Sequence, residues 1–405
     1  MTAVTNARPA LAPRSPRARL RDLVEAHRSI SIIAGMAMIS AALVILPKVP
    51  PLSLVQGEAP WLDAFANAGV FVLLAMGLNV VIGLAGLLDL GYAAFFAIGA
   101  YVYAYSNSPF SQTDLPFLPM LPIGAAVAAI FGIALGAPTL RLRGDYLAIM
   151  TLGFGEIVPI VFLNLDPWTQ GTNGIGGIYR PEPLPVIGFF GALTPGAYLY
   201  LMLIIVTIAM ILLYRLQDSR IGRAWNAIRE DELAAAGMGI NTVATKLLAF
   251  AMGATTAGLA GVFNASKLTI VSPDQFLFTV SFTVLAMVIL GGMGNIWGVA
   301  AGAFIVYIIQ VVVLKGLNGM VTGIPFLHGI NFLDYQFLLY GIVLVVMMLF
   351  RPEGLFPSQR RRAELHIAEE FAEAEGEEVV EEVPVAGSMG ATPGSDELGG
   401  DGGPR

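Results

Sequence analysis

The sequence predicts an all-α polytopic membrane protein. Hydrophobic residues make up 56% of the 405 residues and charged residues only 13%, about half the charged share of soluble domains. The mean hydropathy is +0.74, and several uninterrupted apolar runs exceed the roughly 18 residues that indicate a spanning helix. We therefore expect about ten transmembrane helices with both termini in the cytoplasm.

The chain divides into three parts by composition. Residues 1–29 form a basic segment that we expect in the cytoplasm, and residues 30–352 form the transmembrane domain. Residues 353–405 are rich in glutamate and then in glycine and serine, which predicts a frayed helix followed by a disordered cytoplasmic tail. The first apolar run shows no clear cleavage signal, so we interpret it as a retained span rather than a signal peptide.

The apolar runs give the expected spans in order. Prolines, glycines and charged residues separate these runs. The spans are 30–46, 64–88, 93–105, 121–138, 146–163, 197–214, 247–265, 277–290, 298–314 and 334–350.

The distribution of basic residues predicts the orientation of these spans. Lysine and arginine are enriched in cytoplasmic loops. With the spans above, the basic N-terminus, the turn from Arg141 to Asp145, residues 215–246 and Arg351–Arg362 all lie on one side. The few basic residues expected on the outer side are Lys48, Arg180, Lys267 and Lys315.

The second span is unusually rich in glycine, with Gly77, Gly83 and Gly86 in one stretch. Such glycines either let helices approach closely or mark a broken helix that lines a cavity. Asn79 within the span predicts a hydrogen bond between helices, and Asp89 at its end predicts a cap or turn residue.

Two further glycine patterns point to packing. Gly253, Ala257 and Gly261 recur at four-residue spacing on the seventh span and predict a face of close helix contact. The sequence GGMGNIWG at 291–298 joins two apolar spans rather than a strand and a helix, so we interpret it as a tight turn and not as a nucleotide fingerprint.

Glu156 is the clearest ionisable residue within a span. An acid at mid-bilayer costs a few kcal/mol, so it faces a bundle interior, a partner or a water-filled path. Two interpretations stay open: a group on the substrate path that contacts a substrate ammonium, or a hydrogen bond between helices.

Residues 215–246 form a long charged segment between two apolar spans. Ile221, Trp225 and Ile228 follow the i, i+4, i+7 spacing of one helix face. We expect Gly237 and Gly239 to stop this helix. The segment is either a docking element for another protein or a helix that lies on the lipid headgroups.

Several kinds of chemistry are absent from the sequence. The chain has no cysteine, which excludes disulfides and thiol nucleophiles. No GxxxxGK[ST] motif occurs, so the chain does not bind ATP in a P-loop. His27, His328 and His366 lie far apart and show no metal-ligand spacing. No paired acids or clustered histidines indicate a membrane enzyme, and we expect no catalytic residue, metal or cofactor in this chain.

Four sequence blocks follow one another along the chain: GLNVVIGLAGLLDLGYAAFFAIGAY (77–101), LRLRGDYLAIMTLGFGEIV (140–158), SRIGRAWNAIREDELAAAGMGIN (219–241) and VILGGMGNIWGVAAGA (288–303). Together they resemble the branched-chain amino acid ABC importer permeases of the LivM type. The resemblance covers roughly residues 64–352. It implies a permease subunit in the bacterial cytoplasmic (inner) membrane that works by alternating access. Its implied partners are a second permease, sister or self, two ATPase subunits that bind the ATP, and an extracytoplasmic substrate-binding protein; nucleic acid is not among them.

The resemblance also implies roles for individual residues. The segment with Glu232, Ala234, Ala235 and Gly239 is similar to the coupling loop of ABC importers. Within it, we expect the apolar face to anchor in a groove and the charges to face the ATPase. The expected coupling residues are Ile221, Arg223, Trp225, Ile228, Glu230, Asp231, Glu232 and Gly239.

The substrate path and the substrate are less closely specified. We expect the path to involve Asn79, Gly83, Gly86, Asp89 and Glu156. The outer segment TQGTNGI departs from the TGG-x-NGI of the family, and Pro159 stands where many relatives have a basic residue. The predicted substrates are therefore branched-chain or related amino acids. The alternative is a secondary amino acid transporter driven by an ion gradient.

Overall fold

The computed structural model describes residues 28–48, 58–139, 145–185, 187–191, 193–314, 335–351 and 354–356. Seven helices in this part of the chain are long and apolar enough to cross a membrane, and Ala93–Ser106, Ile296–Val311 and Gln336–Phe350 are shorter apolar helices. The all-α polytopic class is therefore confirmed. The count of about ten spans and the cytoplasmic position of both termini stay predictions. Residues 1–27, Arg141, Arg143, Lys315 and the acidic tail lie outside the described residues.

The first half of the chain contributes these elements in order: α2 (Arg28–Ile45), η1 (Leu46–Lys48), α4 (Glu58–Asn79), η2 (Val80–Leu84), α5 (Ala93–Ser106), α6 (Phe117–Thr139), α7 (Asp145–Asn164), α8 (Asp166–Thr169), η3 (Gly171–Asn173) and β1 (Ile175–Gly176). The second half contributes α9 (Pro195–Gln217), α10 (Arg220–Glu230), α11 (Glu232–Gly237), α12 (Thr242–Leu268), β2 (Ile270–Val271), η4 (Pro273–Phe276), α13 (Phe278–Gly291), α14 (Ile296–Ile308), η5 (Ile309–Leu314) and α16 (Gln336–Phe350).

Helix α12 lies at the centre of the packing. It contacts α5 and α6 on one side and α4 on another, and α4 in turn contacts α9 and α14. Glycines make the closest approaches possible: a Cβ added at Gly99 of α5 would lie 2.5 Å from the Cα of Gly258. A Cβ added at Gly253 would lie 2.6 Å from a methyl group of Val81. The close-contact face predicted for the seventh span is thus confirmed.

The second span is a broken helix. We expected it to continue to Leu88, but α4 turns into the short π-helix η2, and the helix ends at Leu84. The chain then runs without helical structure until α5 begins at Ala93. Gly86, in the left-handed region at φ +70°, lies in this non-helical stretch. An apolar run continues through the break, where Ala85 and Leu87 are buried although Gly86 and Leu88 are exposed, so hydropathy alone does not mark the end of the helix.

The segment between α9 and α12 forms two short helices rather than one. We expected the first helix to stop at Gly237 and Gly239, but α10 ends at Glu230. Asp231 has an extended backbone, and its side chain accepts hydrogen bonds from the backbone N–H groups of Leu233 and Ala234. This N-cap begins α11, which then ends at Gly237 as predicted for the glycine.

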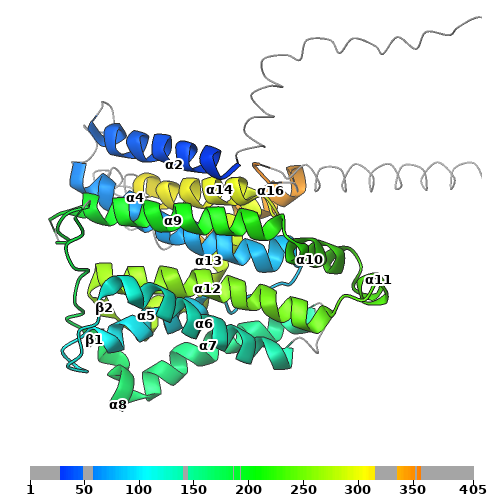
Figure 1. Ribbon diagram of the computed structural model, residues 1–405, viewed down its shortest axis with the longest axis horizontal. Helices are drawn as coiled ribbons and strands as arrows, with labels where there is room; N and C mark the ends of the chain where they lie inside the picture. Colours follow the sequence, from blue (N-terminus) through cyan, green and yellow to red (C-terminus); the bar gives the residue numbers. More distant parts are fainter. Residues whose placement is uncertain are drawn as a thin grey trace, which may run out of the picture. The chain divides into compact units, whose positions relative to one another are not determined.

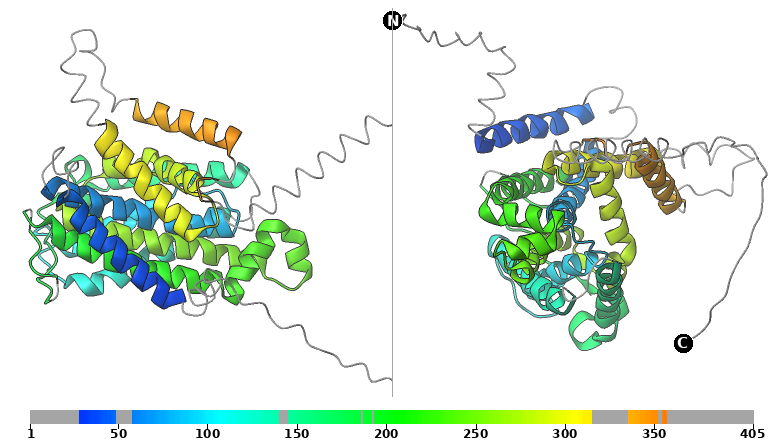
Figure 2. Two further views of the ribbon diagram at one scale, coloured as in Figure 1. Left: turned by 90° about the horizontal axis from the view of Figure 1, so that it is seen from above. Right: turned by 90° about the vertical axis from the view of Figure 1, so that its right-hand side faces the viewer.

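The two ends of the bundle differ in character. Helices α10 and α11 lie at one end, and α8, β1 and β2 lie at the other (Figure 1). At the second end, β1 pairs antiparallel with β2, with Ile175 opposite Val271. Helix α2 lies along the outside of the bundle against α9 (Figure 2). The turn predicted at 291–298 is confirmed, since residues 292–295 connect α13 to α14 with positive φ at Gly292 and Gly294.

Candidate functional site

Helix α10 is seated in a groove of its own chain. Ser219 caps its N-terminus by accepting from the N–H groups of Ile221 and Gly222. Trp225 is fully buried, and its Nε1 donates to the Thr245 carbonyl of α12 at 2.7 Å. Ile228 is buried as well. Ile221, the third residue of the predicted apolar face, is 37% exposed, so this face is buried only in part. Trp225 and Ile228 anchor α10 to α9 and α12, which leaves the opposite face for a partner.

The outer face of the segment carries charges. Arg223, Glu230 and Asp231 are exposed. Glu232 is half-buried, because it pairs with the buried Lys246 of α12 at 2.6 Å. Glu232 thus holds α11 against α12, and among the predicted coupling residues the exposed charges are the first three. Gly239 has φ +85° and reverses the chain before Asn241 caps α12.

Two exposed apolar residues beside these charges were missed in the sequence analysis. Leu233 is 71% exposed and Met238 is 85% exposed. Large apolar side chains at the exposed tip of a charged segment are typical of contact surfaces. The sequence does show them, as two large apolar residues that lie outside the helix face of Trp225.

Asn79 and Gly83 come together at the end of the broken helix. The Asn79 side chain is buried, and its Oδ1 accepts from the Gly294 N–H at 2.8 Å. A Cβ added at Gly83 would lie 2.6 Å from the same Gly294 nitrogen. These residues pack against the turn between α13 and α14. Arg229, which the sequence analysis did not single out, joins them here by donating to the Gly83 carbonyl at 2.7 Å.

Asp89 lies apart from that cluster, in the non-helical stretch before α5. It is buried, and its Oδ1 accepts from the Gly91 N–H at 2.9 Å, which is the geometry of a turn residue. Its other carboxylate oxygen has no hydrogen-bond partner among the described residues. Asp89, Thr139 and Thr151 line a cavity of about 10 Å³, which has room for about one water molecule and not for an amino acid.

Glu156 faces outward from α7. Gly155 beside it is buried and packs on the backbone of Gly91, whereas Glu156 itself is exposed. Ile157 and Ile160 on the same helix are also more than half exposed. The structure therefore separates Glu156 from Asn79, Gly83 and Asp89 within one chain.

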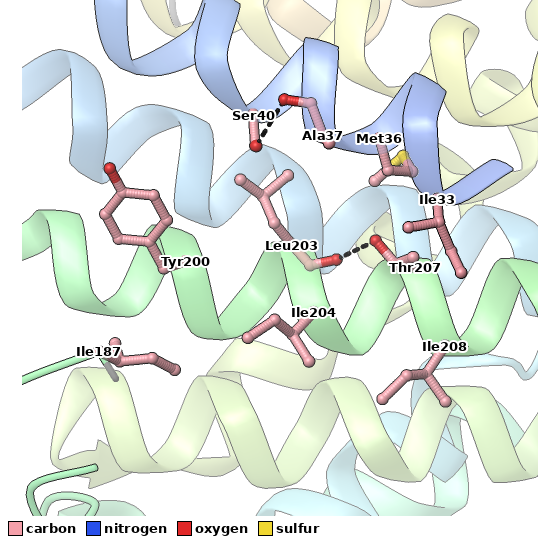
Figure 3. A pocket seen from close by; sticks show the side chains of 10 residues that line it. All are labelled: Ile33, Met36, Ala37, Ser40, Ile187, Tyr200, Leu203, Ile204, Thr207 and Ile208. Carbon is pink, nitrogen blue, oxygen red and sulfur yellow. Dashed lines mark hydrogen bonds between the residues drawn. The ribbon is translucent and has the colours of Figure 1, made fainter. Parts of the chain in front are cut away.

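A groove of about 440 Å³ between α2 and α9 is mostly apolar, with Ser40, Tyr200 and Thr207 as its polar lining residues. Figure 3 shows its lining: the Ser40 hydroxyl donates to the Ala37 carbonyl and the Thr207 hydroxyl donates to the Leu203 carbonyl. Both hydroxyls are thus engaged within their own helices. The groove presents no charged group to an ammonium or a carboxylate, so it suits an acyl chain better than an amino acid.

The fold and the site together define a polytopic membrane transport protein. Apolar helices form a bundle with a broken helix at its core, and a polar helix pair anchored at one end presents charges outward. The family model described as "Branched-chain amino acid transport system / permease component" matches residues 62–348. The chain therefore belongs to this family of transport permeases.

Individual relatives agree with the family model. The chain is 37% identical to the high-affinity branched-chain amino acid transport system permease protein LivM of Salmonella typhimurium over 343 residues, covering 80% of this chain and 76% of the relative. It is 38% identical to the protein of the same name from Escherichia coli over the same shares. A probable branched-chain amino acid transport permease protein LivM from Methanocaldococcus jannaschii is 25% identical over 70% of this chain and 84% of its own length. No solved structure matches the chain.

Proposed function

We propose that this chain is the membrane-spanning permease subunit of an ATP-driven importer for branched-chain or related amino acids in the bacterial cytoplasmic membrane. The observation that carries the proposal is the α10–α11 pair. Its inner face is fixed to the bundle by Trp225 and by the Glu232–Lys246 ion pair, and its outer face is charged. Because the α10–α11 pair is already folded and packed against the bundle, it transmits the movement of a partner without first having to fold. The names of the relatives support the substrate class.

The sequence contains no P-loop, so the proposal assigns ATP binding to separate subunits. Separate ATPase subunits bind ATP and close, and they dock on Arg223, Glu230, Asp231 and the exposed Leu233 and Met238. Charges across such a contact fix its register and the apolar residues supply its affinity. The movement of α10 and α11 then opens the path toward the other side of the membrane. An extracytoplasmic binding protein delivers the amino acid at the end that carries β1 and β2.

The exposed side of α7 supports pairing with a second permease. An ionisable side chain that faces lipid at mid-span costs a few kcal/mol, and Glu156 is exposed in the single chain. A second permease, of the same or a sister sequence, covers this side in our proposal. Glu156 then faces the path between the two bundles, where its carboxylate contacts the ammonium of the substrate.

Glu156→Leu should lower amino acid uptake by about tenfold or more, because the loss of a charged hydrogen bond to the substrate costs about 1.5–3 kcal/mol. Glu156→Gln keeps a hydrogen-bonding group and should give an intermediate rate. Uptake of labelled amino acid into proteoliposomes measures both. Ile160→Leu, one turn along the same exposed side, is the control and should transport normally. Normal uptake by Glu156→Leu would remove Glu156 from the path.

The function itself is tested by purifying the tagged chain in mild detergent and reconstituting what accompanies it. A P-loop ATPase and a second permease should co-purify, and uptake should require ATP and the binding protein. Uptake by the chain alone, driven by an ion gradient without ATP, would instead establish the secondary transporter.

A further inference from the structure

The end of the broken helix α4–η2 is capped by a residue from another element. After η2 the backbone N–H groups of residues 85, 86 and 87 donate to the carbonyls of residues 80, 82 and 81. The Gly83 carbonyl accepts instead from Nη1 of Arg229 on α10, at 2.7 Å. Carbonyls at a helix C-terminus need donors and carry partial negative charge. A guanidinium is well suited to this position.

Gly86, just beyond the end of the broken helix, makes room for this arginine. Gly86 has φ +70°, and a Cβ added there would lie 2.8 Å from Cγ of Arg229. Any larger residue at position 86 would displace the side chain, and it would also adopt a backbone conformation that L-residues rarely take. The close approach of α10 to the helix end therefore depends on glycine at position 86 and arginine at position 229.

The contact continues beyond the helix end. Asn79, one turn before Gly83, accepts from the Gly294 N–H at 2.8 Å. A Cβ added at Gly83 would lie 2.6 Å from the same nitrogen, so the two segments touch directly. A continuous series of contacts thus leads from α10 through the end of α4–η2 to the turn between α13 and α14.

We propose that Arg229 is the positioning residue that transmits movement of α10 to the core of the bundle. This inference rests on the function proposed above. Trp225 fastens α10 to α12, whereas Arg229 connects α10 to the end of a helix that is already broken. Because Arg229 holds the end of α4–η2 through the Gly83 carbonyl, a shift of the Arg229 side chain should move that helix end. The exposed charges of α10 and α11 receive the force, and Arg229 carries it inward.

The test compares uptake with ATP hydrolysis in the complete assembly, reconstituted with its ATPase and binding protein in proteoliposomes. Arg229→Gln should lower the amount of amino acid transported per ATP by about tenfold, because the charged hydrogen bond to Gly83 is lost. ATP hydrolysis should stay within about twofold of the wild-type rate, since the docking residues Arg223, Glu230 and Asp231 are unchanged and one charge nearby contributes little to a surface contact. Arg229→Lys keeps the charge and one donor, and it should recover part of the coupling. Arg220→Gln removes the same charge from the exposed start of the same helix and should leave the ratio unchanged.

The outcomes separate the inference from the function on which it rests. If wild-type assemblies show no ATP-dependent uptake, both proposals fall. If the wild type transports with ATP and Arg229→Gln keeps the wild-type ratio of uptake to hydrolysis, only the role of Arg229 is overturned. If Arg229→Gln no longer retains the ATPase or loses hydrolysis together with uptake, the residue supports the structure and does not transmit movement, which also overturns the inference.

Discussion

Gly99→Leu should prevent the chain from reaching its folded state. Helices α5 and α12 approach so closely that a Cβ at position 99 would lie 2.5 Å from the Cα of Gly258. The obstructing atoms belong to the backbone, so no side-chain rotation relieves the clash. Overpacking with side chains in the way costs about 1–3 kcal/mol, and we expect a backbone clash to exceed that range. The yield of monodisperse protein in detergent and the apparent Tm measure the effect.

Gly153→Leu provides the matched control. Gly153 also lies in an apolar helix, α7, but a Cβ added there meets no atom within 4 Å. The same substitution should therefore leave yield and Tm close to those of the wild type. Gly99→Ala should fall between the two variants. If Gly99→Leu and Gly153→Leu are equally stable, α5 and α12 do not pack against each other through Gly99 and Gly258.

The count of about ten spans stays a prediction. The helices themselves were predicted closely, because membrane helices must be long and apolar. Their ends were predicted less well where hydropathy carries no signal. Helix α12 begins at Thr242 rather than at residue 247, since the Asn241 side chain caps it by accepting from the Ala244 N–H. That cap could have been identified from the asparagine. The break after Leu84 could not be placed, because the sequence stays apolar from Leu84 to Leu88 and hydropathy does not change there.

The location of the candidate coupling segment could be predicted from the sequence, but the residues that contact this segment could not. The periodicity of Ile221, Trp225 and Ile228 identified the helix, and two of these three residues, Trp225 and Ile228, form its inner face. The periodicity did not identify the residues that contact this segment, because each of them is distant in sequence. Arg229 bonds to a carbonyl 146 residues away. Within 219–241, Glu232 looked equivalent to its acidic neighbours, and only the position of Lys246 on α12 sets it apart.

Trp225→Ala should release α10 from the bundle and abolish most uptake. The side chain is fully buried, and its Nε1 donates to the Thr245 carbonyl at 2.7 Å. Removing a buried tryptophan costs about 3–5 kcal/mol, which is large for a helix of 11 residues. The loss is local, because the transmembrane helices keep their own packing. Trypsin cleavage between residues 219 and 241 should become faster, while the purified chain stays folded and monodisperse.

Two further variants identify the cause of the release. Trp225→Phe keeps most of the buried area and removes only the donor to Thr245, so it should cost about 1 kcal/mol and retain most uptake. Trp168→Ala removes a tryptophan that is 57% exposed on α8, at the other end of the bundle. It should leave trypsin cleavage of the segment unchanged. Slow cleavage in Trp225→Ala would mean that the contacts of Arg229 and Glu232 suffice to hold α10 and α11. Coupling would then depend on those polar contacts and not on the buried ring.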